Sequence, residues 1–216
     1  MHRACVAAIM VSVACLATPR EVSGQRLRLG IRGGVNLATW GGADVNDFET
    51  AFGVSVTSRT GVTAGGLVSF PLGGPISLQP ELLYVAKGAK FESGGSSATL
   101  NMGYVEVPVL LVITPGVQGS VRPSIFAGGA IAFKLSCNLS GGGTSDTCTN
   151  QGIDTKGVDY GVVFGAGLGF SVGAGELQLD GRYDLGLGKI DNSSPPSAIS
   201  NRGIVVTAGY LFRIGR

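Results

Sequence analysis

The chain of 216 residues has few charged side chains, a single histidine and, after its first 24 residues, no apolar run long enough for a helix to cross a bilayer. Charged residues make up 14% of the sequence, against roughly 25% in an average soluble domain. The mean hydropathy of +0.34 is nevertheless that of a membrane protein. With a net charge of +2 and no basic cluster, the sequence does not indicate nucleic-acid binding.

The N-terminal segment predicts a secretory signal peptide over residues 1–24. Arg3 supplies a short basic region, and residues 4–18 are uncharged and mostly apolar. Cleavage would leave residues 25–216 as a single mature domain. The alternatives are an ordinary buried N-terminal helix and a lipoprotein signal that is lipidated at Cys15.

Cleavage would remove His2, the histidine of this chain, so a Ser–His–Asp or Cys–His catalytic site is not expected. We predict neither an enzyme nor a cofactor site. The mature chain keeps Cys137 and Cys148, with ten residues between them on a polar segment. In an oxidising compartment they should form a disulfide, which contributes roughly 2–3 kcal/mol in the chain-entropy model. Zinc binding at these cysteines is the alternative, but metal binding is not predicted.

Residues 176–187 alternate between apolar and polar side chains, which places them on opposite faces of a strand. The polar face carries Glu176, Gln178, Asp180, Arg182 and Asp184. Four charges cannot lie unpaired in a dry core. Only helices and closed barrels satisfy their backbone hydrogen bonds in lipid. High hydropathy without a spanning helix therefore predicts a barrel with an apolar outer wall and a polar filling.

The same period of two recurs along the chain. The alternating segments are 27–37, 62–70, 76–87, 104–113, 121–135, 159–172, 176–187 and 204–214. Their lengths suit tilted strands of roughly 9–11 residues that cross a bilayer. Short connections alternate with long ones, and the long ones are 38–61, 88–103, 136–158 and 188–203. The sequence predicts an all-β fold: an eight-stranded antiparallel up-and-down transmembrane β-barrel with short periplasmic turns and long extracellular loops.

Aromatic side chains on the outward positions predict two girdles at the membrane interfaces. The girdle at the short turns contains Phe70, Phe170, Tyr210 and Phe212, and the girdle at the long loops contains Tyr84, Phe133 and Tyr160.

The inward positions carry seven cations and six anions. They are Arg28, Arg32, Lys87, Arg122, Lys134, Arg182 and Arg213, with Glu81, Glu106, Asp159, Glu176, Asp180 and Asp184. An eight-stranded barrel is just wide enough to be filled by its side chains. The balanced set therefore predicts a salt-bridged plug, and glycines in segment 159–172 should make room for long arginine side chains. A proton or ion path and a ligand pocket are the alternatives.

Several motifs resemble those of the PorT-like family of outer-membrane β-barrel proteins. The resemblance is carried by Leu78–Lys90, Tyr104–Leu111, Gly165–Gly167 and Gly181–Leu187, with Gly30–Leu37 and Gly209–Phe212 at the two ends. It implies an outer-membrane barrel of a Gram-negative bacterium, folded by the barrel-assembly machinery and surrounded by outer-membrane lipid. It also implies that Glu81 and Glu106 are inward carboxylates on neighbouring strands. Because two such carboxylates repel each other, we expect Lys87 or Arg122 between them.

Three functions remain open at this point. The first is a non-enzymatic protein of the cell outer membrane, with a structural or surface-interaction role and an extracellular or envelope protein as partner. The second is a transporter or narrow channel for a small solute. The third is a soluble lipocalin-like barrel that binds a hydrophobic ligand, which would turn its apolar face inward.

Overall fold

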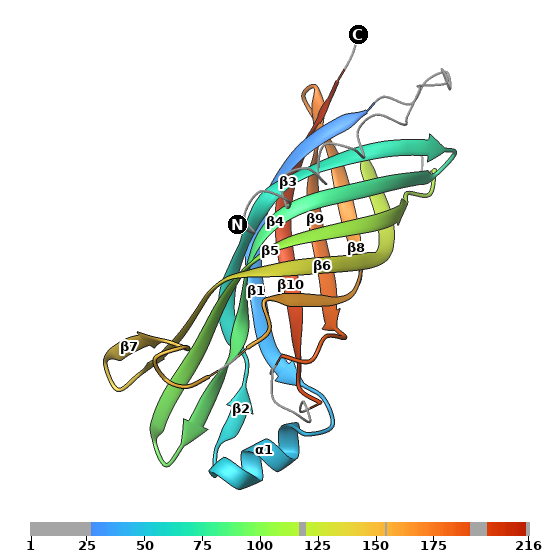
Figure 1. The fold of residues 1–216 in the computed structure, drawn as a ribbon. Coiled ribbons are helices and arrows are strands. Elements are labelled where there is room, and N and C mark those ends of the chain that lie inside the picture. The colour runs from blue at the N-terminus through green and yellow to red at the C-terminus, as the bar shows by residue number, and fades with distance from the viewer. Residues whose placement is uncertain (1–26, 117–119, 154, 191–197, 215–216) are drawn as a thin grey trace, which may run out of the picture.

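The computed structural model describes residues 27–116, 120–153, 155–190 and 198–214. Within these ranges, eight long antiparallel strands follow one another around a closed barrel (Figure 1). The long strands are β1 (Arg28–Gly41), β3 (Arg59–Gly73), β4 (Ile76–Ser93), β5 (Ser96–Ile113), β6 (Val121–Gly141), β8 (Val158–Val172), β9 (Gly175–Gly186) and β10 (Ser200–Arg213). Pairing of β1 with β10 closes the wall, so the predicted up-and-down topology is confirmed. The predicted signal peptide lies outside the described residues.

Three short elements lie at the long-loop end of the barrel (Figure 1). They are α1 (Val45–Phe52), β2 (Ser55–Thr57), which pairs with β4, and β7 (Thr144–Thr147), which pairs with β6. In the part of the chain that the structure describes, there is no helix with the length and apolar character that crossing a membrane requires.

Two of the predicted long loops are largely strand. Segment 88–103 is the outer part of the β4–β5 hairpin, which turns at Gly94 and Gly95, both with positive φ. Glycine adopts this conformation without steric cost, as a two-residue hairpin turn requires. Likewise β6 continues to Gly141 and turns back into β7. We predicted that these strands end where the outward apolar side chains stop. Antiparallel pairing continues beyond that point, so β4, β5 and β6 project past the rest of the wall (Figure 1).

The outer face of the wall is apolar, and the inner face carries the charged side chains together with a number of apolar ones. On β9, Leu177 and Leu179 are 37% and 46% exposed, whereas Asp180 and Arg182 are 6% and 4% exposed. A lipocalin-like barrel requires the opposite orientation, so that alternative is wrong. The outward side chains leave a continuous apolar surface that suits lipid rather than water.

The aromatic residues of the two predicted girdles lie on this outer wall. Phe70 and Phe212 are exposed near the short turns, and Tyr84, Phe133 and Tyr160 are exposed toward the long loops. Phe170 and Tyr210 are half-buried. The Tyr210 hydroxyl donates a hydrogen bond to the carbonyl oxygen of Val172 at 2.8 Å, and its ring packs on Phe212.

Because the outer face of the wall contacts lipid, the free-energy cost of an outward charge depends on how deep in the bilayer the charge lies. We expect Leu179→Arg to reduce the free energy of unfolding in lipid vesicles by roughly 2–4 kcal/mol, because Leu179 lies in the middle of β9. The matched control is Leu72→Arg, which places the same charge near a short turn and should cost only about 0–1 kcal/mol. Urea titration of both variants in vesicles measures the difference, and equal costs would show that the predicted depth is wrong.

Candidate functional site

β9 supplies the main inward row of polar side chains in the lumen. Every second residue from Glu176 to Asp184 points inward, because side chains alternate along a strand. The four charged members of this row are each less than a tenth exposed. Since the row runs from the short-turn end to the long-loop end, its partners on other strands are arranged in layers along the barrel axis.

The central layer is an ion-pair network of four buried residues. Arg32 on β1 lies 2.9 Å from Asp180 and 3.3 Å from Glu81, measured between Nη1 and the carboxylate oxygens. From β9, Arg182 Nη1 donates to Glu81 Oε2 at 2.9 Å. β4 and β9 are four positions apart in the ring of eight strands, so the Arg182–Glu81 pair spans the lumen. Two cations and two anions make this layer neutral.

Neutral polar groups complete the central layer. Gln79 Nε2 donates to Glu81 Oε1 at 2.8 Å, and Arg32 Nη2 donates to Gln178 Oε1 at 3.3 Å. The Arg182 guanidinium also lies 5.5 Å from the centre of the Phe126 ring, a cation–π contact. An unpaired buried ion costs several kcal/mol, so these contacts are what allow charged side chains to fill the barrel.

The layer near the short turns contains two arginines and one carboxylate. Arg28 and Arg122 both contact Glu176 Oε2, at 3.4 and 3.1 Å. Both guanidinium groups are partly exposed, whereas Glu176 is buried. Arg213 was expected inside the lumen, but it occupies the last position of β10 and its side chain is exposed. It therefore lies at the rim of the barrel, because the wall ends there.

The layer toward the long loops has an excess of carboxylates. Lys87 forms an ion pair with Glu106, and Asp159 accepts a hydrogen bond from Asn201 Nδ2 at 2.9 Å. Lys87, Glu106, Asp159 and Asp184 line a cavity of about 10 Å³, which is close to the space of one water-sized sphere. Among the described residues, Oδ1 of Asp184 has no hydrogen-bond partner. Three carboxylates against one ammonium group give this layer a formal charge of −2.

Two expected contacts are corrected by this arrangement. Lys87 pairs with Glu106, but Glu81 is held by Arg32 and Arg182, so the two glutamates do not share a cation. Arg122 was a candidate because its strand neighbours β5. It is the second residue of β6, however, and lies at the short-turn end beside Glu176.

Lys134 extends toward the loop that follows β7. Its Nζ donates to the carbonyl oxygen of Thr155 at 2.5 Å and to the Thr155 hydroxyl at 2.7 Å. The side chain thus links β6 to this loop, which is a contact that strand periodicity does not predict.

The glycines of β8 make room for other groups than the arginines we expected. A Cβ at Gly167 would lie 2.0 Å from an Asp180 carboxylate oxygen, and one at Gly165 would lie 2.7 Å from the Phe126 ring. The missing side chains therefore admit a carboxylate of the central layer and the ring on which Arg182 rests.

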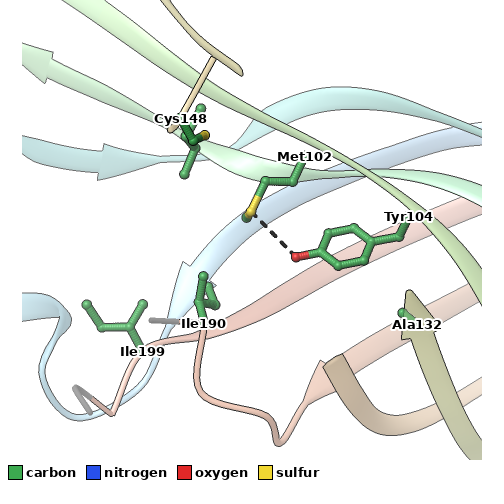
Figure 2. Close-up of a cluster of buried hydrophobic side chains, with 7 residues drawn as sticks. Met102, Tyr104, Ala132, Cys148, Ile190 and Ile199 are labelled. Carbon is green, nitrogen blue, oxygen red and sulfur yellow. Dashed lines mark hydrogen bonds between the residues drawn. The ribbon is translucent and has the colours of Figure 1, made fainter. Parts of the chain in front are cut away.

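An apolar cluster fills the barrel between the charged layers and the long loops. Its buried members are Leu100, Met102, Tyr104, Ala132, Cys148, Ile190 and Ile199 (Figure 2). Trp40, Phe48 of α1 and Phe91 pack against it, with ring centroids 5.1–5.8 Å apart. This cluster was not predicted, although Leu100 and Met102 continue the inward alternation of Tyr104 and could have revealed it.

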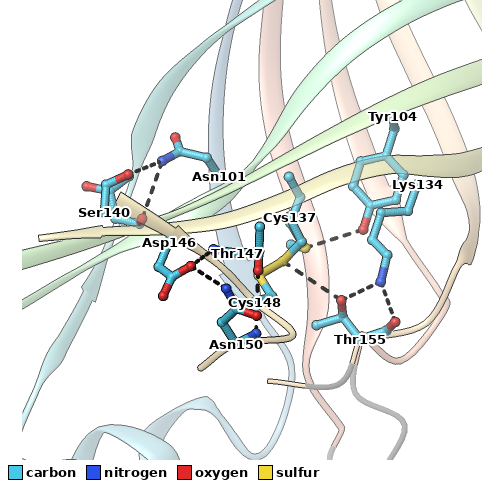
Figure 3. Close-up of a disulfide and its surroundings, with 12 residues drawn as sticks. Asn101, Tyr104, Lys134, Cys137, Ser140, Asp146, Thr147, Cys148, Asn150 and Thr155 are labelled. Carbon is cyan, nitrogen blue, oxygen red and sulfur yellow. Dashed lines mark hydrogen bonds between the residues drawn. A yellow bond between two sulfur atoms is a disulfide. The ribbon is translucent and has the colours of Figure 1, made fainter. Parts of the chain in front are cut away.

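The structure joins Cys137 and Cys148 in a disulfide, as the sequence predicts (Figure 3). The bond connects β6 to the segment after β7, and Cys148 itself is buried in the apolar cluster. Nearby, hydrogen bonds from the Asn150 side chain and the Thr147 backbone hold the pKa of Asp146 below its usual value. The disulfide therefore fixes a polar outer hairpin to the apolar filling of the barrel.

Metal-binding geometry is not found among the described residues: no group of three or more His, Cys, Asp or Glu side chains there could hold an ion. The arrangement is suited to closing the lumen, with paired charges at mid-height and apolar side chains above them.

Comparisons with known proteins agree with this architecture. The sequence model of the family described as "Outer membrane protein beta-barrel domain" matches residues 18–192. The outer membrane protein OprG from Pseudomonas aeruginosa has a TM-score of 0.53 at 12% identity, covering 88% of this chain and 99% of OprG. Neisserial surface protein A has a TM-score of 0.51 at 13% identity, covering 86% of this chain and 97% of that protein. These two likenesses show the barrel fold. No curated protein matches the sequence.

Because the central layer is buried, removing one of its carboxylates should destabilise the barrel much more than removing an exposed carboxylate. Glu81→Gln should reduce the free energy of unfolding by about 3 kcal/mol or more, because it removes the carboxylate that pairs with Arg182 and leaves two buried guanidinium groups with Asp180 as the remaining anion of the layer. The matched control on the same strand is Glu92→Gln, which breaks an exposed pair with Lys90 and should cost about 0–1 kcal/mol. Denaturant titration in detergent micelles compares the two, and a neutral Glu81 variant would contradict the network.

Proposed function

The chain belongs to the outer membrane protein beta-barrel domain family and lies in the outer membrane, and on this premise we propose that it is a non-enzymatic protein with a plugged lumen and a structural or surface-interaction role. The observation that carries the proposal is the Arg182–Glu81 pair, which joins opposite walls of the barrel with both side chains 2% exposed or less. Arg32 and Asp180 complete the same layer. A solute would have to break buried ion pairs in order to pass.

The apolar cluster supports closure of the lumen at a second position along the barrel axis. It fills the extracellular end with Leu100, Met102 and Tyr104, and the rings of Trp40 and Phe48 pack over it. Ions pass such a constriction only at a high desolvation cost. A solute path would therefore need movement of both the cluster and the ion-pair network.

The projecting hairpins support a role at the cell surface. β4, β5, β6 and β7 form a small sheet beyond the membrane wall (Figure 1), and the Cys137–Cys148 disulfide fixes it to the barrel. A rigid, polar projection loses little conformational entropy when it binds. We propose an extracellular or envelope protein as its partner, with outer-membrane lipid around the wall and the barrel-assembly machinery as the partner during folding.

The narrower assignment to the PorT-like family is also a proposal. It is supported by the Gln79–Leu82 and Tyr104–Leu111 motifs, which supply inward carboxylates at Glu81 and Glu106. The non-enzymatic role is supported by the engagement of both carboxylates in ion pairs with Arg or Lys, since a general acid or base needs a carboxyl group that is available to substrate.

A narrow cation path is the second candidate, and the acidic layer is the observation that favours it. Asp184, Asp159 and Glu106 outnumber Lys87, and a small cavity lies among them. A ring of carboxylates is the usual basis of cation selectivity in pores.

Recording in planar bilayers separates the two candidates. Purified protein, shown to be folded by a compact gel band that shifts on boiling, should give no reproducible conductance because both plugs are closed. Asp184→Asn serves as the matched variant and should be equally silent. A reproducible cation-selective current in the wild type that falls in Asp184→Asn would establish the path and refute the plugged lumen.

A further inference from the structure

We propose that one face of the projecting hairpins binds the neutral sugars of a glycolipid in the outer leaflet. This face, here called the hydroxyl–amide face, carries Thr99, Asn101, Asn138, Ser140, Ser145 and Thr147. The contact is with the membrane's own glycolipid, and it depends neither on the plugged lumen nor on a protein partner.

Strand register places the six side chains of this face on the same side of the sheet. Residues opposite each other in paired strands share a side, as do residues two apart on one strand. One row contains Thr99, Ser140 and Ser145, and the next row toward the barrel contains Asn101, Asn138 and Thr147. Asn101 Nδ2 donates to Ser140 Oγ at 3.4 Å (Figure 3), and Ser140 Oγ lies 2.9 Å from Ser145 Oγ. These hydrogen bonds join the two rows into one polar surface.

The hydroxyl–amide face continues the lipid-facing side of the wall. Pairing of β4 with β5 runs without a register shift from Lys90–Thr99 to Tyr84–Val105, so Thr99 lies on the same side as Tyr84. Tyr84 belongs to the girdle near the long loops. A Cβ at Gly103, the next position outward, would lie 3.0 Å from the Tyr84 hydroxyl oxygen and 2.7 Å from Ser136 Oγ. The polar surface therefore begins directly at the aromatic girdle, where the headgroups of the outer leaflet lie.

The opposite face of the hairpins is covered by the filling of the barrel. Leu100 and Met102 are buried in the apolar cluster, and Phe91, Cys137 and Leu139 pack against it. The polarity of the two sides therefore reverses at the girdle, because the outward side is apolar in the wall and polar beyond it. The hydroxyl–amide face is turned away from the lumen and borders the leaflet, since the hairpins continue directly from the wall and extend to one side of the barrel (Figure 1).

The chemistry of this face favours neutral sugars as the occupant. Hydroxyl and amide side chains both donate and accept hydrogen bonds, as sugar hydroxyls do. The cation in the row of Thr99 is Lys90, which forms an ion pair with Glu92 at 2.6 Å, so its charge is already balanced and a phosphate group is a poorer match. Protein interfaces are instead centred on aromatic residues and arginine and are poor in serine. The six residues of the face include neither aromatic residues nor arginine.

Nuclear Overhauser effects to threonine methyl groups test the contact. The folded protein is placed in phosphatidylcholine nanodiscs that contain lipopolysaccharide with its core sugars. We expect effects between sugar protons and the methyl groups of Thr99 and Thr147. The control is Thr144, which is exposed on the other face of β7 and should show none. Absence of the effects at Thr99 and Thr147, or equal effects at Thr144, would overturn the proposal.

Two further samples identify the source of the sugars. Nanodiscs with lipid A, which lacks the core sugars, should give severalfold weaker effects at Thr99 and Thr147. Undiminished effects with lipid A would overturn the assignment to neutral sugars. Equal effects from dextran added to phosphatidylcholine nanodiscs would overturn the assignment to a glycolipid of the leaflet.

Removing the polar groups tests which side chains hold the sugars. Asn101→Ala combined with Ser140→Ala should reduce the effects at Thr147 severalfold, whereas the matched control Thr144→Ala should leave them unchanged. The compact gel band that shifts on boiling verifies folding of each variant. Asn138→Ala leaves the Asn101–Ser140 hydrogen bond in place and should also weaken the effects at Thr147. Unchanged effects in the folded Asn138 variant or in the folded double variant would overturn the role of these side chains.

Discussion

The barrel depends on the pairing of charges across its lumen. Closing eight strands puts every second side chain inside, and on β9 most of those side chains are ionised. Each of these ions would oppose folding if it were buried alone. The network of Arg32, Glu81, Asp180 and Arg182 resolves this conflict, since β1, β4 and β9 bring opposite charges within 3.3 Å.

The remaining features follow from this filling. Because the charged groups occupy the inside, the face of each strand that carries no charges is turned outward and provides the apolar, lipid-facing wall. Glycines on β8 leave space where the network and the Phe126 ring are bulky. On the long-loop side of the network, Tyr104 and Cys148 belong to a buried apolar cluster. Ion pairs, wall and cluster thus belong to one barrel, with the projecting hairpins as its outermost part.

Strand number, topology and face orientation could be predicted from the sequence, because a period of two in hydrophobicity reports directly on the two faces of a strand. The ion-pair partner of each inward carboxylate could not be predicted in this way. Arg122 and Lys87 were equivalent candidates by strand order, whereas depth along the axis decided between them. The outer hairpins were also missed, since polar residues such as Lys90 and Asn101 interrupt the outward apolar pattern while the strand pairing continues. Arg213 shows the same limit, because periodicity does not reveal where the wall ends.

The central claim is that apolar side chains face lipid while the other face of each strand is closed to it. Nuclear Overhauser effects between lipid acyl protons and side-chain methyl groups, measured on the unmodified protein in nanodiscs, test this directly. The account predicts strong effects at Leu168 and Leu179, which face outward, and none at Leu83 and Leu110, which face inward. Lipid contacts at Leu83 and Leu110 with none at Leu179 would contradict it.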